Sequence, residues 1–322
     1  MPRVLFSDNE FPDLELEKQL FARHGIDLAV AQCRTEDDVI REAQGAFGIL
    51  LQYAPVSDRV LRALPDLVII RRIGAGFDTI DTRACERHGV WVANSPDYGV
   101  GEVATHALAL ALASIRNIVA YSRDIAAGKW HYLSSGPLRR ASDMTIGIVG
   151  LGRIGKRMAH LSRNVFRRVI AADPYLIDGD FPAFVERAQI DALFRDADVV
   201  SLHTPLNDET RGMIGARLVD TMRPGSFLVN TSRGAVVDVD AALAAVERGT
   251  LAGLALDVLP VEPVARDSRL LENPRVILTP HAAFFSVAAE QELRRKAAQN
   301  LVSWSQTGRP DYVVTAGTRK PA

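Results

Sequence analysis

Four polar side chains in the last third of the chain could do chemistry together. Arg233 follows the segment SFLVNTS, Asp257 ends LAGLALD, Glu262 lies just beyond it, and His281 follows RVILTP. Each segment is short and rich in aliphatic residues, which is typical of a buried strand. Ligands of open α/β sheets bind outside the carboxyl ends of the strands, so we expect these side chains to meet in one crevice.

These residue types suit the reduction of a carbonyl group. That reaction needs a proton donor, a cation that polarises the oxygen, and a group that tunes the donor. Each residue also has a simpler interpretation, because Arg233 alone is typical of a solvated loop and Glu262 before Pro263 is typical of a turn. Their order behind a nucleotide-binding motif favours the functional interpretation.

That motif is GIVGLGRIGK, residues 147–156. Gly150, Gly152 and Gly155 lie where an apolar run gives way to a helical pattern over 153–166. In a dinucleotide-binding turn the first glycine permits the turn, the second lets the backbone approach the pyrophosphate, and the third lets helix and strand pack closely. The glycines alone would also suit a tight turn, but Asp173 follows 18 residues after Gly155. Its carboxylate is placed to accept ribose hydroxyls and to repel the 2′-phosphate of NADP, so we predict NAD.

The elements that position these residues begin at the N-terminus. We expect strands within 3–8, 26–31, 47–51, 67–74 and 90–96, and helices within 11–25, 36–45, 57–65 and 82–89. Strands rich in Val, Ile and Leu without strict alternation indicate a parallel sheet that is covered on both faces. Residues 1–98 therefore read as one α/β unit.

A second series follows a long helical stretch expected over 100–127. Its strands are expected at 144–149, 168–173, 198–205, 226–232, 251–258 and 275–281, with helices at 153–166 and 238–249 and a final helix at 286–307. The predicted fold class is therefore α/β, with two doubly wound parallel-sheet domains.

The composition is that of an ordinary globular protein. The 322 residues are 48% hydrophobic and 24% charged, with a net charge of −1, so they suffice for two domains and lack the basic excess of a nucleic-acid surface. Two cysteines, Cys33 and Cys85, indicate neither a disulfide framework nor a metal site. The apolar stretch 103–120 contains His106 and Arg116, so we expect a buried helix rather than a membrane span. The N-terminus does not resemble a secretory signal, and we expect a cytoplasmic protein without membrane partners.

Four ordered segments, GIVGLGRIGK, NTSRGAVVD, ALDVLPVEP and ILTPHAA, resemble the D-isomer-specific 2-hydroxyacid dehydrogenase family. The resemblance covers nearly the whole chain. It implies an NAD-dependent oxidoreductase that transfers a hydride between NADH and a 2-oxo acid, reversibly giving a D-2-hydroxy acid. It also implies a catalytic trio in which His281 is the acid/base, Glu262 orients it, and Arg233 binds the keto oxygen and the carboxylate.

The resemblance further implies which residues bind the two ligands. Asp257 is expected to hold the nicotinamide carboxamide. The expected cofactor-binding residues are Gly150, Gly152, Arg153, Ile154, Gly155, Asp173, His203, Thr204, Pro205, Thr210, Thr231, Ser232, Asp257, His281 and Ala283. The backbone N–H groups of Gly74, Ala75 and Gly76 are expected to receive the substrate carboxylate, with Arg72 adding a charge-assisted bond and with Tyr53 and Phe284 lining the pocket. This lining favours a modestly bulky or apolar acid without naming one.

The resemblance implies a discontinuous architecture. A flavodoxin-like substrate domain, residues 1–98 and 284–322, is expected to face a Rossmann NAD-binding domain, residues 99–283, across a cleft. Residues 99–130 match the family's interdomain helix and dimerisation arm, so a homodimer is expected. The segments RIGAGFD, NSPDYGVGEVATHA, ADPYLIDG and HAAFFS look most like the branch of the C-terminal-binding-protein corepressors. A dimeric NAD(H)-sensing scaffold with little turnover therefore remains an alternative to the enzyme.

Overall fold

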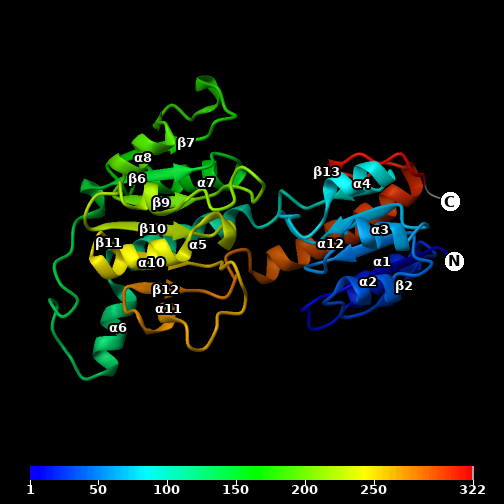
Figure 1. Ribbon diagram of the computed structural model, residues 1–322, viewed down its shortest axis with the longest axis horizontal. Coiled ribbons are helices and arrows are strands. Elements are labelled where there is room, and N and C mark those ends of the chain that lie inside the picture. The colour runs from blue at the N-terminus through cyan, green and yellow to red at the C-terminus, as the bar shows by residue number, and fades with distance from the viewer. Residues whose placement is uncertain (321–322) are drawn as a thin grey trace. The chain divides into compact units, whose positions relative to one another are not determined.

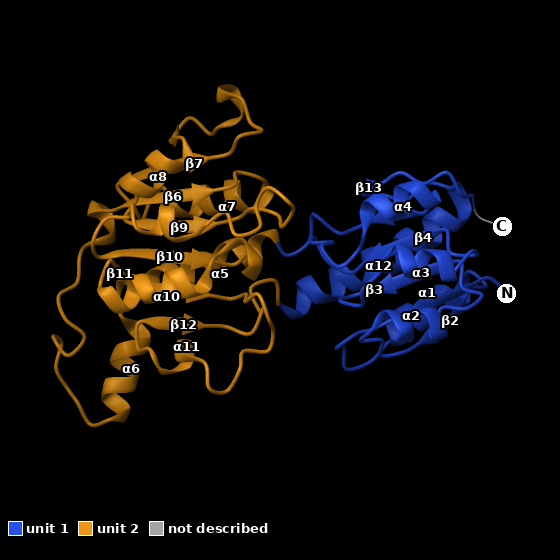
Figure 2. Ribbon diagram, in the orientation of Figure 1, with its two compact units in different colours: residues 1–99, 286–322 blue, residues 100–285 orange. Residues whose placement is uncertain are grey.

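The computed structural model describes residues 1–320. The chain divides into two compact units (Figure 2). Unit 1 consists of residues 1–99 and the described part of 286–322, and unit 2 is the continuous segment Val100–Phe285. Unit 2 is thus inserted between the two parts of unit 1.

Unit 1 is built on a six-stranded sheet in the order β13-β5-β4-β3-β1-β2. Its strands are β1 (Arg3–Phe6), β2 (Asp27–Val30), β3 (Gly48–Leu51), β4 (Ile69–Arg72), β5 (Trp91–Ala93) and β13 (Val313–Thr315). All pairs are parallel except β13 with β5, so the predicted parallel sheet is confirmed apart from one antiparallel edge strand. Strand β13 has only three residues, so it shows no periodicity in the sequence. It is added to the edge of the sheet, antiparallel to β5, when the chain returns after its last helix.

Helices cover both faces of this sheet (Figure 1). One core contains residues of α2 (Glu36–Glu42), α3 (Asp58–Ala63) and α4 (Thr82–His88). The other core contains residues of α1 (Glu15–Arg23) and α12 (Val287–Thr307), among them the fully buried Trp304. The inner strands β1, β3 and β4 are almost fully buried, which explains their largely aliphatic composition, whereas the edge strands β2 and β13 are partly exposed.

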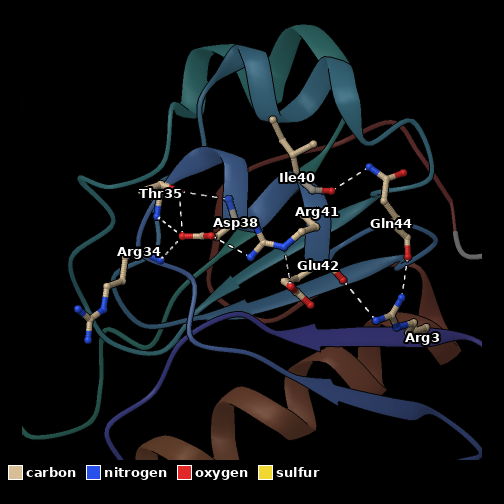
Figure 3. Close-up of polar contacts among 8 residues, drawn as sticks. All are labelled: Arg3, Arg34, Thr35, Asp38, Ile40, Arg41, Glu42 and Gln44. Carbon is tan, nitrogen blue, oxygen red and sulfur yellow. Dashed lines mark hydrogen bonds and ion pairs between the residues drawn. The ribbon is translucent and has the colours of Figure 1, made fainter.

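The start of α2 shows how local sequence sets an element boundary (Figure 3). The Asp38 N–H donates to the Thr35 side chain at 3.2 Å, and the Asp38 carboxylate accepts from the Thr35 N–H at 3.1 Å, which forms a capping box. Hydrogen bonds from Thr35 and Arg41 hold the pKa of Asp38 well below its usual range. At the other end of α2, Arg3 of β1 donates to the carbonyl oxygens of Glu42 and Gln44, which ties the helix to the sheet.

Unit 2 is built on a seven-stranded, fully parallel sheet in the order β12-β11-β10-β9-β6-β7-β8. Its strands are β6 (Thr145–Val149), β7 (Arg168–Ala172), β8 (Val185–Arg187), β9 (Val199–Leu202), β10 (Ser226–Asn230), β11 (Leu251–Leu256) and β12 (Val276–Leu278). The chain starts in the middle at β6, runs outward to β8, and then returns to β9 on the other side. This is the order of the doubly wound dinucleotide-binding fold, whose ligand crevice lies where the direction reverses, between β6 and β9.

Two cores pack against the faces of the second sheet. Helices α5 (Val100–Ile115) and α7 (Arg153–Ser162) contribute to one core, and α8 (Ile190–Asp196), α9 (Ala216–Val219) and α10 (Val239–Arg248) contribute to the other. The short α11 (Arg269–Glu272) precedes β12. The strand β8 and the helices α8, α9 and α11 are elements that the sequence analysis did not foresee.

The helical stretch expected over 100–127 forms two helices rather than one. Asn117 adopts a left-handed conformation, with φ 50°, and separates α5 from α6 (Ile118–Ala126). Asparagine tolerates this conformation better than most residues, so it ends the helix there. Burial of this stretch holds for α5, whereas α6 has no buried residue. Within residues 1–320, no one helix has the length and apolarity to span a membrane; α5 and α6 taken together do so by length and composition alone, and they are bent by 58°.

Candidate active site

The glycine-rich turn between β6 and α7 lies at the reversal point of the second sheet (Figure 1). Gly150 has φ 87°, and a Cβ there would come within 2.6 Å of the His203 carbonyl oxygen. A Cβ on Gly155 would collide with the carbonyl group of Gly150. A Cβ on Gly152 would meet no atom within 4 Å. Two glycines are therefore required by the fold, and the third leaves open space at the N-terminus of α7, where free N–H groups favour an anion.

Asp173 follows β7 and is half-buried beside this turn. One carboxylate oxygen accepts from the Leu151 N–H at 2.9 Å, and the other accepts from the Tyr175 N–H at 3.0 Å. These bonds fix the carboxylate at the turn, and each oxygen keeps a lone pair for a further donor. Arg153 and Ile154 are the first two residues of α7.

The loop after β9 forms the other side of the reversal point. The His203 N–H donates to the Val149 carbonyl oxygen at 2.7 Å, and its Nε2 lies 2.9 Å from the Ser201 hydroxyl. Burial lowers the pKa of His203 to about 4, so the ring is neutral at pH 7. Further along, the Thr210 hydroxyl donates to the Pro205 carbonyl oxygen at 2.7 Å and closes the loop.

Two buried hydroxyls at this edge of the sheet lack partners among residues 1–320. They are Oγ1 of Thr204, after β9, and Oγ1 of Thr231, after β10. Buried polar atoms are normally hydrogen-bonded, so such a pair indicates a missing ligand. Together with the open space at Gly152 and the carboxylate of Asp173, these donors and acceptors fit a dinucleotide.

Arg233 is carried by a turn that Asn230 organises. The Asn230 side chain donates to the Arg233 carbonyl oxygen at 2.9 Å and accepts from the Ser232 N–H at 3.0 Å. Next to it, a Cβ on Gly234 would collide with the backbone of Leu259 and Pro260. This close approach brings the turn of Arg233 against the loop that carries Glu262. Asn230 was not among the predicted site residues, although an asparagine directly after a strand is a signal for such a turn.

Glu262 and His281 are paired. Glu262 Oε2 lies 2.8 Å from His281 Nδ1, and Oε1 accepts from the Leu259 N–H at 2.8 Å. Partial burial alone would raise the pKa of Glu262, but the hydrogen bonds from His281 and Leu259 and the charges of His281 and Arg233 outweigh it and hold that pKa below its usual value. The carboxylate is therefore ionised and fixes the ring through Nδ1.

The Phe284 ring lies edge-on to the His281 ring, with 6.4 Å between centroids. His281 itself has φ 53°, which is uncommon for a residue other than glycine. Asp257 stabilises this conformation, because its carboxylate accepts hydrogen bonds from the N–H groups of Ala282 at 2.9 Å and Ala283 at 3.0 Å. The side chain of Asp257 is only 1% exposed. It thus has a structural task in this turn, whatever contact it makes with a cofactor.

The remaining predicted residues lie in unit 1. The guanidinium of Arg72 lies over the Tyr53 ring, 5.5 Å from its centroid, and packs against Gly74. Gly74 has φ 141°, and its carbonyl oxygen accepts from the Ser95 N–H at 2.9 Å. The Ala75 carbonyl oxygen accepts from the Asn94 side chain at 2.6 Å, and Gly76 follows in the same loop. Hydrogen bonds from Ser95 and Asn94 therefore fix the loop, and Ala75 is exposed.

The structure thus groups the predicted residues by unit. Arg233, Glu262, Asp257 and His281 come together around one end of the second sheet, on the loops after β10, β11 and β12. Among residues 1–320, no three His, Cys, Asp or Glu side chains are arranged to hold a metal ion.

Comparisons with known proteins agree with this geometry. Residues 108–283 match the NAD-binding domain of the D-isomer-specific 2-hydroxyacid dehydrogenases. The chain is 34% identical to a glyoxylate reductase of Korarchaeum cryptofilum, over 97% of this chain and 96% of that protein. It is 31% identical to a glycerate dehydrogenase of Methylorubrum extorquens, over 88% and 90% of the two chains.

A solved structure of a relative has the same fold as this chain. The D-lactate dehydrogenase of Aquifex aeolicus, complexed with NAD and lactic acid, superimposes with a TM-score of 0.86 over 95% of this chain and 96% of that one, at 28% identity. These relatives are enzymes, which favours an enzyme over a nucleotide-sensing scaffold. The corepressor-like branch stays a prediction. The chain belongs to the D-isomer-specific 2-hydroxyacid dehydrogenases and is an NAD-dependent oxidoreductase that acts on small 2-oxo and 2-hydroxy acids.

Proposed function

We propose that Arg233, Glu262 and His281 carry out the reaction, with His281 as the acid/base. The observation that carries this proposal is the 2.8 Å contact between His281 Nδ1 and Glu262 Oε2. Nδ1 is bound to the carboxylate, and in this proposal Nε2 is the atom that holds the transferred proton. The charge of Arg233 contributes to the lowered pKa of Glu262.

In the reducing direction the bound NADH supplies a hydride to C2 of the 2-oxo acid. Nε2 of the protonated His281 gives its proton to the keto oxygen, and a hydroxyl group forms there. Arg233 stabilises the negative charge that develops on this oxygen and binds the carboxylate. Glu262 stabilises the charged imidazole before the transfer. The ring then regains a proton from solvent, so that NADH, a proton and the 2-oxo acid give NAD⁺ and the D-2-hydroxy acid.

Unit 1 is proposed as the substrate domain. In this proposal the backbone N–H groups of Gly74, Ala75 and Gly76 bind the substrate carboxylate, and Tyr53 and Arg72 line the pocket. The fixed loop and the buried guanidinium support this role, since a preorganised site loses less entropy on binding. Substitution of Tyr53 by Ala is expected to change KM for the 2-oxo acid and to leave the Kd of NADH unchanged.

We also propose a preference for NAD over NADP. The carboxylate of Asp173 is fixed at the turn by two backbone N–H groups, so a 2′-phosphate would meet a negative charge that cannot swing away. A comparison of the Kd values of NADH and NADPH tests this directly. In an Asp173→Ser variant the Kd values of NADH and NADPH are expected to be closer to each other than in the wild type.

A homodimer is proposed from the segment that follows α5. Five apolar side chains between residues 118 and 133 are at least 48% exposed: Ile118, Ile125, Trp130, Tyr132 and Leu133. A cavity of about 660 Å³, lined by residues such as Val119, Phe227 and Ile277, lies against the same segment. Exposed apolar surface of this kind marks an interaction site. A cytoplasmic location is proposed as well, because Cys33 and Cys85 are buried free thiols.

Substitution of the trio tests the proposal. His281→Ala and Arg233→Ala are each expected to reduce kcat about a thousandfold with NADH and a panel of glyoxylate, pyruvate and hydroxypyruvate. Binding of NADH, followed by its fluorescence, is expected to be unchanged. His160→Ala is the matched control, because this exposed histidine lies on α7 and its contacts are with the Lys156 carbonyl oxygen and the Phe184 ring. Full activity of His281→Ala would refute the assignment.

A further inference from the structure

The turn that carries His281 is wrapped around one buried carboxylate. Asp257 Oδ1 accepts from the Thr279 hydroxyl at 2.5 Å and from the Ala282 N–H at 2.9 Å, and Oδ2 accepts from the Ala283 N–H at 3.0 Å. The His281 N–H donates to the backbone carbonyl oxygen of Asp257 at 2.8 Å. Asp257 therefore holds the chain before, at and after His281. Any group that fixes Asp257 and Thr279 also fixes the backbone of the histidine.

The backbone at His281 needs such support. Its φ of 53° lies in the left-handed region, which residues with a Cβ adopt only where their surroundings impose it. If the bonds on either side weaken, the residue is expected to relax toward a commoner conformation. The ring would then leave the position in which Nδ1 meets Glu262.

His106 lies at the outer end of this network. Its Nε2 is 3.0 Å from the Thr279 hydroxyl oxygen and 3.6 Å from Asp257 Oδ1. The Thr279 hydroxyl hydrogen is used by Asp257, so the hydroxyl oxygen accepts and His106 Nε2–H donates. The result is a chain of donors that runs from His106 through Thr279 to the carboxylate.

The element that carries His106 is a rigid platform. His106 belongs to α5, a helix of 16 residues that packs against α7, β10 and β11. Its neighbours Ala104 and Ala107 are fully buried. The side chain of His106 is 26% exposed, so it is not required to fill the core. A polar side chain at this place is better explained by its contact with Thr279 than by packing.

We propose that His106 is a positioning residue for the reaction: through Thr279 and Asp257 it holds the turn 279–283 in the conformation that presents His281. This inference rests on the proposed role of His281. His106 has no direct contact with substrate in this account. It acts on kcat through the geometry of the acid/base, because a small displacement of a reacting group costs a large part of the rate.

Kinetics of matched variants test the inference. His106→Leu removes the donor and is expected to lower kcat about ten- to a hundredfold, with KM for the 2-oxo acid and the Kd of NADH changed less than about twofold. His106→Gln places an amide N–H near the position of Nε2 and is expected to restore most of kcat. Thr279→Val breaks the same chain, so the double variant His106→Leu/Thr279→Val is expected to be no slower than the slower single variant.

Hydrogen exchange supplies a readout that does not depend on turnover. The N–H groups of Ala282 and Ala283 are expected to exchange faster in His106→Leu than in wild type, and at the wild-type rate in His106→Gln. His160→Leu is the control, since it replaces a histidine of the same unit that lies outside this network. Thermal unfolding of all variants shows whether the whole unit has been weakened.

The outcomes separate this inference from the proposed function. Wild-type kcat in His106→Leu, together with an inactive His281→Ala, overturns the inference alone. Equal loss of kcat in His106→Leu and His106→Gln, with equal loss of thermal stability, also overturns it, because the role is then merely structural. Full activity of His281→Ala removes the proposed function and this inference together.

Discussion

Replacement of Gly152 by alanine separates the binding of the cofactor from the stability of the fold. Gly152 precedes α7 with φ −70° and ψ −159°, which alanine adopts without strain. Its added methyl group would meet no protein atom within 4 Å. The free energy of unfolding is therefore expected to change by less than about 0.5 kcal/mol. The methyl group occupies only the space through which a pyrophosphate would approach the N-terminus of α7.

The expected loss of affinity follows from the bonds that are displaced. A hydrogen bond to a charged group contributes about 1.5–3 kcal/mol. If the methyl group keeps the pyrophosphate from one such N–H group, binding of NADH weakens by about ten- to a hundredfold, since 1.4 kcal/mol corresponds to tenfold. Gly155→Ala is expected to behave differently. Its Cβ would collide with the backbone of Gly150, so about 1–3 kcal/mol of stability is lost as well.

Fluorescence titration with NADH and denaturation in urea measure the two quantities. Gly179→Ala is the matched control, because Gly179 lies in the same unit, has no positive φ, and has no atom within 4 Å of the added Cβ. It is expected to keep both the affinity and the stability of the wild type. A Gly152→Ala variant that binds NADH with the wild-type Kd would refute the reasoning, since the open space would then not be used by the cofactor.

Three further predictions concern pH and assembly. The pKa of Glu262 lies below its ordinary 4.5, so the stability that its bonds provide is complete above pH 4.5 and is lost as the pH falls through the lower folded-state pKa. In Glu262→Gln, the free energy of unfolding measured with urea is expected to depend less on pH in this acidic range. Burial lowers the pKa of His203 from 6.5 to about 4, so the unfolded chain takes up this proton first, and stability is expected to fall between about pH 6.5 and 4; His203→Gln should remove that slope, and an unchanged slope would contradict the assignment. Trp130 and Tyr132 are 88% and 77% exposed; in sedimentation, the double variant Trp130→Glu/Tyr132→Glu is expected to be a monomer where the wild type is a dimer, and a monomeric wild type would argue against the proposed interface.

A structural feature can be predicted from the sequence where the backbone geometry at that position accepts only one type of residue. Gly150 and Gly155 are examples, because a close backbone approach after a buried strand admits no side chain. The central strands of both sheets are recognisable for a similar reason, since burial on two faces requires continuous aliphatic runs, whereas the edge strands β8 and β13 are partly exposed and were missed. The break at Asn117 was missed, because a helical pattern continues on both sides of it and a single left-handed residue leaves no periodic signal.

Most of the contacts at the site could not be predicted, because they depend on where side chains point in the folded protein and on residues that are far apart in the chain. Asp257 is recognisable as a carboxylate at the end of a strand, but its use depends on N–H groups that lie 25 and 26 residues further along the chain. His106 in an apolar helix gives no indication that it meets Thr279, 173 residues away. Arg71 and Arg72, at the end of β4, are both buried, although two consecutive arginines are more typical of a solvated loop.

The insertion of unit 2 into unit 1 has a consequence for synthesis of the chain. All strands of unit 2 have been translated before α12 is made, whereas the face of the unit 1 sheet that α1 and α12 cover still lacks α12. α12 supplies Leu293, Leu301 and Trp304 to the core that covers Phe6 and Ile69. A nascent chain at this stage therefore carries the strands of the nucleotide-binding unit together with a sheet whose apolar face is only partly covered. The ribosome must deliver α12 before that surface is protected from other nascent chains.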